Sequence, residues 1–126
     1  MKRVLITGAS GFVGSNVYMG LRDNFQVLPA SGGDLRDPIV CQKVVKDSNC
    51  DVVVHVAGKV GGIGANAKSP GRFFHDNMLM GLHMIEQSRQ VGVEKFIMLG
   101  TVCSYPNLTP VPFKEEDIWN GYPEET

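Results

Sequence analysis

Residues 4–14 read Val-Leu-Ile-Thr-Gly-Ala-Ser-Gly-Phe-Val-Gly, and this stretch decides the fold. Val4-Leu5-Ile6 is a short apolar run typical of a buried parallel strand. Glycine then recurs at every third position, at 8, 11 and 14. From Gly11 to Arg22 the apolar residues follow a helical period. The order strand, glycine turn, helix predicts the first unit of an α/β domain.

Strands and helices are expected to alternate along the rest of the chain. The expected strands are Phe25–Leu28, Asp51–Ala57 and Lys95–Gly100; the expected helices run from Pro38 to about Asp47 and from Pro70 to about Val91. Asp37 and Ser69 each precede a proline and are expected to be N-caps. A glycine-rich loop is expected at 58–64, and regular patterns stop after Thr101. An apolar stripe follows the long helix: Phe74, Met78, Leu82 and Ile85.

This alternation predicts an α/β fold with a doubly wound parallel sheet, truncated to about four strands. Right-handed crossovers place helices on both faces of such a sheet. The expected strand order is second, first, third, fourth. The first and third strands then flank the switch point, where ligands bind at the carboxyl ends of the strands.

Composition excludes several classes of protein. The chain has 126 residues, with 12 basic and 13 acidic side chains and a formal net charge of -1. This balance argues against nucleic acid or an anionic membrane as a partner. Three cysteines without a Cys-x-x-Cys pair do not predict a disulfide framework or a zinc site. With neither a signal peptide nor a long apolar run, a cytoplasmic protein is expected.

The glycine turn has the chemistry of a dinucleotide phosphate site. Gly8 permits a tight turn, Gly11 leaves room for a pyrophosphate, and Gly14 lets helix and strand pack closely. The following helix presents free N–H groups and the positive end of its dipole to the phosphates. The alternative is a glycine-rich turn without a ligand. The strand–turn–helix context favours a Rossmann-type NAD(P)-binding domain over residues 1–126.

The Gly-x-x-Gly-x-x-Gly spacing resembles the extended branch of the short-chain dehydrogenase/reductase superfamily, the NAD-dependent epimerase/dehydratase family. The resemblance implies that Asp34 and Leu35 contact the adenine ring; the alternative is a helix cap beside a core leucine. It also implies the full set of cofactor-binding residues, which comprises Gly8, Ser10, Gly11, Phe12, Val13, Gly14, Asp34, Leu35, Val56, Ala57 and Gly58.

The cofactor is expected to be NADP, with NAD as the alternative. An acid at the end of the second strand normally binds the ribose 2′-hydroxyl of NAD. Residues 29–33, Pro-Ala-Ser-Gly-Gly, contain no acid. They contain no arginine for a 2′-phosphate either, although Ser10 and Ser31 could donate hydrogen bonds.

Two further segments sharpen the resemblance. Lys59-Val60-Gly61-Gly62-Ile63 and Cys103-Ser104-Tyr105-Pro106 look like the GDP-L-fucose synthase group. The resemblance implies that Thr101 hydrogen-bonds the substrate carbonyl and that Cys103 is the epimerisation acid/base. A thiol can exchange the weakly acidic protons beside a keto group. The alternative for Cys103 is a buried structural cysteine.

The resemblance therefore implies an enzyme, an NADP(H)-dependent epimerase-reductase that converts GDP-4-keto-6-deoxymannose to GDP-L-fucose. Its substrate is a nucleotide sugar, and the family suggests a homodimer through the long helix. No tyrosine here has lysine four residues later. The family's Tyr-x-x-x-Lys pair, the remaining strands and the substrate domain are expected after Thr126, so the chain alone is expected to be inactive. The alternatives are a related GDP-mannose 3,5-epimerase or a non-catalytic NAD(P)-binding module.

Overall fold

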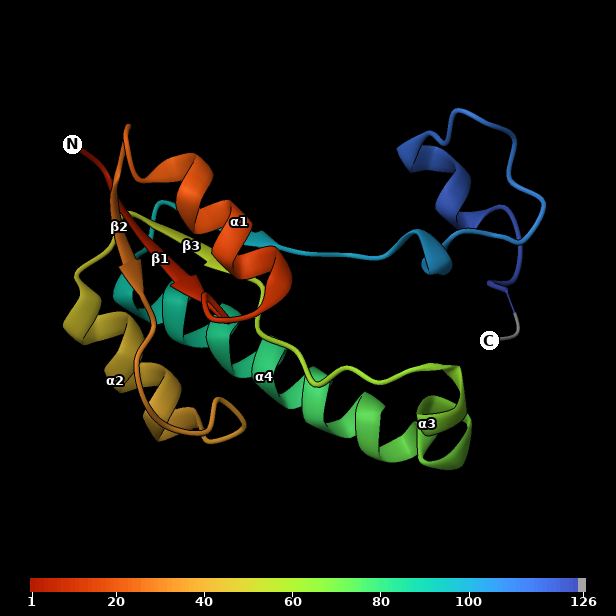
Figure 1. The fold of residues 1–126 in the computed structure, drawn as a ribbon, viewed down its shortest axis with the longest axis horizontal. Coiled ribbons are helices and arrows are strands. Elements are labelled where there is room, and N and C mark those ends of the chain that lie inside the picture. Colours follow the sequence, from red (N-terminus) through yellow and green to blue (C-terminus); the bar gives the residue numbers. More distant parts are fainter. Residues whose placement is uncertain (125–126) are drawn as a thin grey trace.

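The computed structural model describes residues 1–124 and contains a four-stranded parallel sheet. Its strands are β1 (Arg3–Thr7), β2 (Gln26–Pro29), β3 (Val52–His55) and β4 (Lys95–Met98). Their order, β2-β1-β3-β4, confirms the predicted topology (Figure 1). In register, Leu5 pairs with Leu28 on one side and Val53 on the other. The carboxyl ends of all four strands therefore meet at one edge of the sheet.

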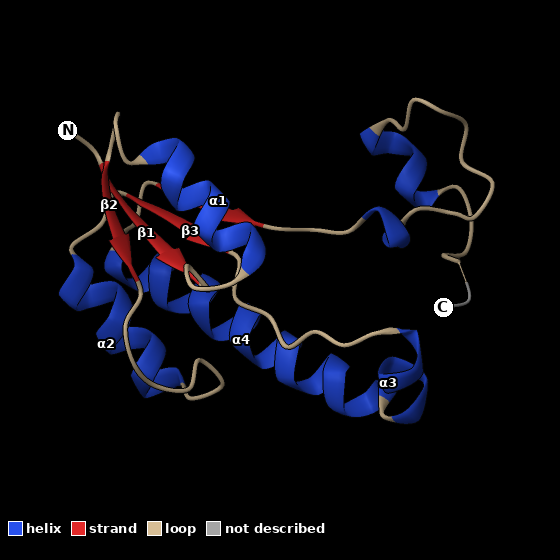
Figure 2. Cartoon of the chain, in the orientation of Figure 1, coloured by secondary structure: helices blue, strands red, loops and turns tan. Residues whose placement is uncertain are grey.

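Helices cover both faces of this sheet, as expected. Helix α1 (Phe12–Leu21) lies on one face, and α2 (Pro38–Ser48) packs beside α4 (Pro70–Val91) on the other (Figure 2). The core lies between the sheet and the α2–α4 layer. Its fully or almost fully buried members are Leu5, Cys41, Val45, Cys50, Val53 and Met84. Cys41 and Cys50 are thus part of the core.

Local signals set most helix ends. The Asp37 carboxylate accepts the Ile39 N–H at 2.8 Å, which confirms the predicted cap. Gly92 ends α4 in the left-handed conformation at φ 85°. Ser69 is the N-cap residue of α4, as predicted, but its side chain makes no capping hydrogen bond. The predicted loop at 58–64 was partly wrong, because a short helix, α3 (Ile63–Lys68), begins inside it.

The apolar stripe of α4 does not face the core. Phe74, Met78, Leu82 and Ile85 are between 46% and 69% exposed. The face toward the sheet carries Met84 and small or polar residues instead. Gly81 allows the Met98 side chain of β4 to approach, since a Cβ there would lie 2.9 Å from its terminal methyl group. The face of α4 toward the sheet therefore contains Met84 and Gly81, and the apolar stripe lies on another face.

The chain leaves β4 as an extended segment that runs away from the sheet (Figure 1). It then forms two short 3₁₀ helices, η1 (Val102–Ser104) and η2 (Glu115–Trp119). Tyr105 and Phe113 stack within this part at a ring-centroid distance of 5.0 Å. β4 is an edge strand, and its Ile97 and Met98 are 42% and 51% exposed. This agrees with the open apolar edge expected of a four-stranded sheet.

Candidate functional site

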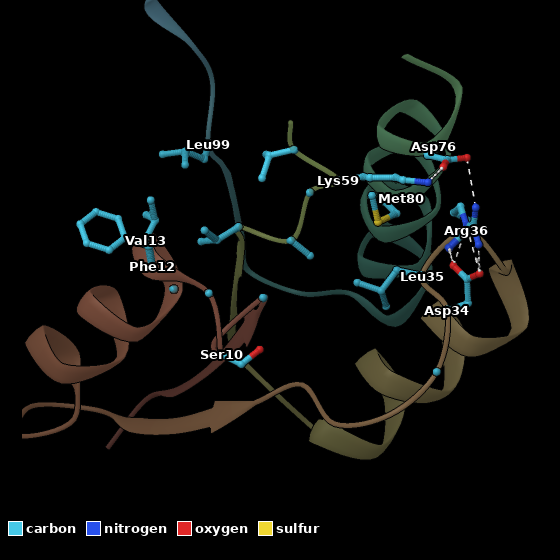
Figure 3. A pocket seen from close by; sticks show the side chains of 18 residues that line it. Ser10, Phe12, Val13, Asp34, Leu35, Arg36, Lys59, Asp76, Met80 and Leu99 are labelled. Carbon is cyan, nitrogen blue, oxygen red and sulfur yellow. Dashed lines mark hydrogen bonds and ion pairs between the residues drawn. The ribbon is translucent and has the colours of Figure 1, made fainter. Parts of the chain in front are cut away.

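A cleft of about 630 Å³ opens at the carboxyl ends of β1 and β3 (Figure 3). All eleven residues predicted to bind a cofactor line it: Gly8, Ser10, Gly11, Phe12, Val13, Gly14, Asp34, Leu35, Val56, Ala57 and Gly58. The structure thus brings together three segments separated in sequence. Their roles toward a ligand remain predictions.

The glycine turn between β1 and α1 tolerates no other residue at its two ends. Gly8 has φ +72°, and a Cβ there would lie 2.7 Å from the backbone nitrogen of Ala57. A Cβ on Gly14 would lie 2.0 Å from the carbonyl oxygen of Gly8. The middle glycine differs, because a Cβ on Gly11 would meet only the Gly8 oxygen, at 3.3 Å. Gly8 and Gly14 therefore hold the helix against the strand, and Gly11 leaves the cleft side of the turn open.

The amino end of α1 is suited to an anion. Gly11 is its N-cap and provides no side-chain hydrogen bond, and the first turn contains no acidic residue. The first N–H groups of a helix have no partner within the helix. Together with the helix dipole, they form a site for phosphate at the floor of the cleft. The residues present therefore fit a dinucleotide.

Strand ends behind the turn are fixed by a buried polar pair. Thr7 Oγ1 lies 2.7 Å from His55 Nδ1 and accepts the N–H groups of Val56 and Ala57 at 3.2 Å. Burial lowers the pKa of His55, which favours the neutral ring. His55 is therefore a core histidine with a hydrogen-bond partner. The pair positions residues 56–57, which line the cleft.

An ionic network occupies the far end of the cleft. The Arg36 guanidinium contacts the Asp34 carboxylate at 2.6–3.0 Å and the Asp76 carboxylate at 3.2 Å. Lys59 Nζ lies 3.0 Å from the other Asp76 oxygen. Hydrogen bonds from Arg36 lower the pKa of Asp34 to about 2. Those from Lys59 and His75 hold the pKa of Asp76 well below its usual range. Both carboxylates are therefore charged at neutral pH.

Asn77 on α4 fixes the backbone of the loop that follows β3. Its Oδ1 accepts the Lys59 N–H at 2.7 Å, and its Nδ2 donates to the carbonyl oxygens of Lys59 and Phe73 at 2.9 Å. These bonds keep Gly58 and Lys59 at the cleft wall. Asn77 thus links the start of this loop to α4.

Neither predicted catalytic residue lines the cleft. Both follow β4. Leu99, two residues before Thr101, is the last residue of this segment that lines the cleft. Thr101 Oγ1 accepts the Cys103 N–H at 3.2 Å at the start of η1. Cys103 is a free, exposed thiol. The alternative of a buried structural cysteine is therefore wrong, while the catalytic role remains a prediction.

Sequence reasoning missed several residues of the cleft. Arg36 and Asp76 form its ionic network, and Lys59, Met80 and Leu99 also line it. Lys59 pairs with Asp76. The structure, and not the sequence, shows that Asp76 is only 3% exposed. Buried carboxylates require partners, and Arg36 and Lys59 provide them here.

Residues 4–125 match the model of the NAD dependent epimerase/dehydratase family. The chain belongs to this family. A GDP-L-fucose synthase of Azorhizobium caulinodans is 37% identical over 123 residues, which are 95% of this chain and 39% of that protein. A GDP-mannose 3,5-epimerase 1 of Oryza sativa subsp. indica is 28% identical, over 98% of this chain and 38% of that protein. The chain spans about two fifths of the length of these family members.

Solved structures agree on the fold. A GDP-L-fucose synthetase from Naegleria fowleri bound to NADP superimposes with a TM-score of 0.80 at 25% identity, covering 99% of this chain and 38% of that one. A GDP-mannoheptose C4 reductase from Campylobacter jejuni with NADP bound gives 0.86 at 23% identity, covering 98% and 40%; this shows the fold alone. The Rossmann-type prediction is confirmed. Within residues 1–124, no helix is long and apolar enough to cross a membrane.

Proposed function

We propose that this chain is the cofactor-binding part of an NADP(H)-dependent epimerase-reductase that converts GDP-4-keto-6-deoxymannose to GDP-L-fucose. One observation carries the proposal: the eleven residues predicted from the family's motifs line a single cleft at the switch point of the sheet. The relatives named GDP-L-fucose synthase support the substrate class.

Each part of the cleft has a role in binding. The amino end of α1 binds the pyrophosphate, and Asp34 and Leu35 contact the adenine. Gly11 keeps the phosphate position free of side-chain atoms. When bound, the dinucleotide supplies the hydride that reduces the keto carbon of the sugar. The chain itself contributes binding and orientation, because positioning the reactants lowers the barrier to transfer.

The segment after β4 contributes the proton chemistry. Thr101 Oγ1 accepts the Cys103 N–H, which leaves its own hydrogen to donate to a sugar carbonyl oxygen. Cys103 Sγ takes the proton from the carbon beside the keto group, and the electron pair of the broken C–H bond moves into an enolate. A second acid, which the resemblance places after Thr126, delivers a proton to the opposite face. The exposure of Cys103 and its lack of a disulfide support its role as the base.

The preference for NADP over NAD rests on the residues after β2. Residues 29–33 carry no carboxylate. An acid there would accept the 2′-hydroxyl of NAD and repel the 2′-phosphate of NADP. We therefore expect this chain to bind NADPH more tightly than NADH.

Titration of the 126-residue chain with NADPH and NADH, followed by nicotinamide fluorescence, tests the binding proposal. Saturable binding that favours NADPH supports it. Gly11→Ala should weaken binding, since its methyl group enters the cleft side of the turn. Gly20→Ala, on the same helix with no atom within 4 Å of the added carbon, is the matched control. A folded chain that binds neither dinucleotide overturns the proposal.

The catalytic part of the proposal needs a Tyr-x-x-x-Lys pair, which the resemblance places after Thr126. Reading the gene beyond the Thr126 codon tests this part. The pair shortly after that codon supports the epimerase-reductase. A stop codon there favours the non-catalytic NAD(P)-binding module. A protein that carries the pair but oxidises no NADPH with GDP-4-keto-6-deoxymannose contradicts the substrate assignment.

A homodimer through α4 and a cytoplasmic location belong to the same proposal. The exposed stripe on α4, at Phe74, Met78, Leu82 and Ile85, supports the dimer because single-face apolar exposure of this kind marks interaction surfaces. Light scattering on the chain and on Leu82→Lys tests it. A wild-type monomer contradicts the dimer.

A further inference from the structure

A buried histidine lies directly behind the wall of the cleft. Strands β1 and β3 are parallel neighbours, and Thr7 pairs with His55 at their carboxyl ends (Figure 1). Both residues are buried, with 0% and 3% of their surface exposed. The next two residues along the chain, Val56 and Ala57, line the cleft. His55 does not line the cleft itself, so its effect on a ligand passes through these two neighbours.

The hydrogen bonds of the Thr7 hydroxyl determine which ring nitrogen of His55 carries the hydrogen. Thr7 Oγ1 accepts the Ala57 N–H at 3.2 Å. It also accepts the Val56 N–H at 3.2 Å, which it shares with the Thr7 carbonyl oxygen at 3.3 Å. A hydroxyl has two acceptor lone pairs and one hydrogen. Both lone pairs are therefore used, and the hydrogen is donated to His55 Nδ1, 2.7 Å away. The neutral ring consequently carries its own hydrogen on Nε2.

A proton on Nδ1 is incompatible with this arrangement. Nδ1 would become a third donor to an oxygen with two lone pairs, and the Thr7 hydrogen would lose its acceptor in a fully buried position. Because a buried polar group without a partner is costly, Thr7 must turn and release the N–H groups of Val56 and Ala57. The glycine turn touches the same segment, since a Cβ on Gly8 would lie 2.7 Å from the Ala57 nitrogen. The added proton therefore disturbs both the wall and the turn.

The groups packed around His55 are mostly uncharged. Its neighbours on β4 are Phe96, with ring centroids 6.1 Å apart, and Met98, its partner in register. Asp76 is the one charged residue among the buried residues of α4, and it belongs to the ionic network at the far end of the cleft. On α2, burial raises the pKa of the Cys41 thiol to about 11, so this group is neutral. Burial is accordingly the cause that lowers the pKa of His55.

We propose that His55 is a proton-linked positioning residue for the dinucleotide: its neutral ring receives the Thr7 hydrogen and keeps residues 56–57 in place, and a proton added at Nδ1 releases this wall and weakens binding. This inference rests on the proposed dinucleotide binding and adds its pH dependence. Linkage is reciprocal, so binding of the dinucleotide must expel the proton from His55. Because the pKa of His55 is lowered from 6.5, affinity is fully present above pH 6.5 and is lost as the pH falls below it.

Calorimetric titration of the 126-residue chain with NADP⁺ at pH 7.5 and 5.5 tests this, with circular dichroism to verify the fold at each pH. Between these values the wild-type chain is expected to lose about fivefold more affinity than His55→Gln, the value of one hydrogen bond. The glutamine amide oxygen accepts the Thr7 hydrogen and does not titrate, whereas the 2′-phosphate of the ligand titrates alike with both chains. His83→Gln is the matched control, because His83 lies on α4 outside the cleft. It should behave as the wild type.

A second measurement needs no change at His55. Long-range ¹H–¹⁵N NMR spectra of the wild-type chain at pH 7.5 should show the His55 hydrogen on Nε2. At the same pH, Thr7→Ser keeps the hydroxyl and should bind like the wild type, whereas Thr7→Val should bind about fivefold more weakly.

Two results overturn the inference and leave the proposed function intact. One is a neutral His55 ring with its hydrogen on Nδ1. The other is a wild-type affinity that changes with pH as it does in His55→Gln, or that rises in acid relative to that variant because the cation attracts the phosphates. A folded wild-type chain that does not bind NADP⁺ overturns both the inference and the proposed function.

Discussion

Replacing Gly14 by alanine tests whether close packing at the glycine turn is what the fold requires. The added Cβ would lie 2.0 Å from the Gly8 oxygen, 2.7 Å from the Gly8 carbonyl carbon and 2.9 Å from the Ala9 Cα. Ordinary contact begins at about 3.4 Å, so helix and turn must separate by more than 1 Å. All three atoms are backbone and cannot rotate away. Overpacking of this kind costs roughly 1–3 kcal/mol.

The control is Gly20→Ala on the same helix, where the new carbon meets nothing within 4 Å. Alanine is the better helix former by about 1 kcal/mol, so this variant should be the more stable one. Urea denaturation followed by circular dichroism measures the free energy of unfolding of both. We expect the free energy of unfolding to fall in Gly14→Ala and to rise in Gly20→Ala. NADPH binding should be weakened only in Gly14→Ala. A Gly14→Ala chain as stable as wild type, with the same affinity, refutes the reasoning.

Three further outcomes are expected. Asp37→Ala removes the acceptor for the Ile39 N–H and should lower the free energy of unfolding by about 1 kcal/mol in urea denaturation; no change would mean that the cap is not needed. Stability should fall as the pH drops below 6.5, because burial lowers the pKa of His55 and the unfolded chain then binds a proton that the folded chain does not. A His55→Gln variant should lack this part of the slope, and an identical pH profile would contradict the assignment. A thiol reagent should modify one cysteine rapidly, Cys103, because the other two are buried; fast reaction persisting in Cys103→Ser would contradict this.

Much of the fold could be predicted from local patterns. The glycine spacing, the alternation of strands and helices and the Asp37-Pro38 cap each depend on neighbouring residues, and the structure confirms them. The orientation of α4 could not be predicted in this way. A helical period shows that an apolar face exists but not which element covers it, and Met84 rather than the stripe reaches the core beneath the sheet.

Some residues of the cleft could likewise be predicted from the sequence, and others could not. Its glycine turn and the Asp34-Leu35 pair were predictable because the motif is continuous in sequence. The Arg36–Asp76 pair was not, because forty residues separate its members and only the packing of α4 brings them together. The helix α3 was missed for a different reason. Glycine favours loops on average, yet Ile63–Lys68 completes a short helix before α4 begins.

The most direct test of the central claim, that this cleft binds a dinucleotide, is an amide NMR titration of the ¹⁵N-labelled chain with NADPH. The account predicts saturable shifts at residues 8–14, 34–36 and 56–58, with α3 and η2 unaffected. Shifts confined to other surfaces, or none at saturating NADPH in a folded chain, would contradict it.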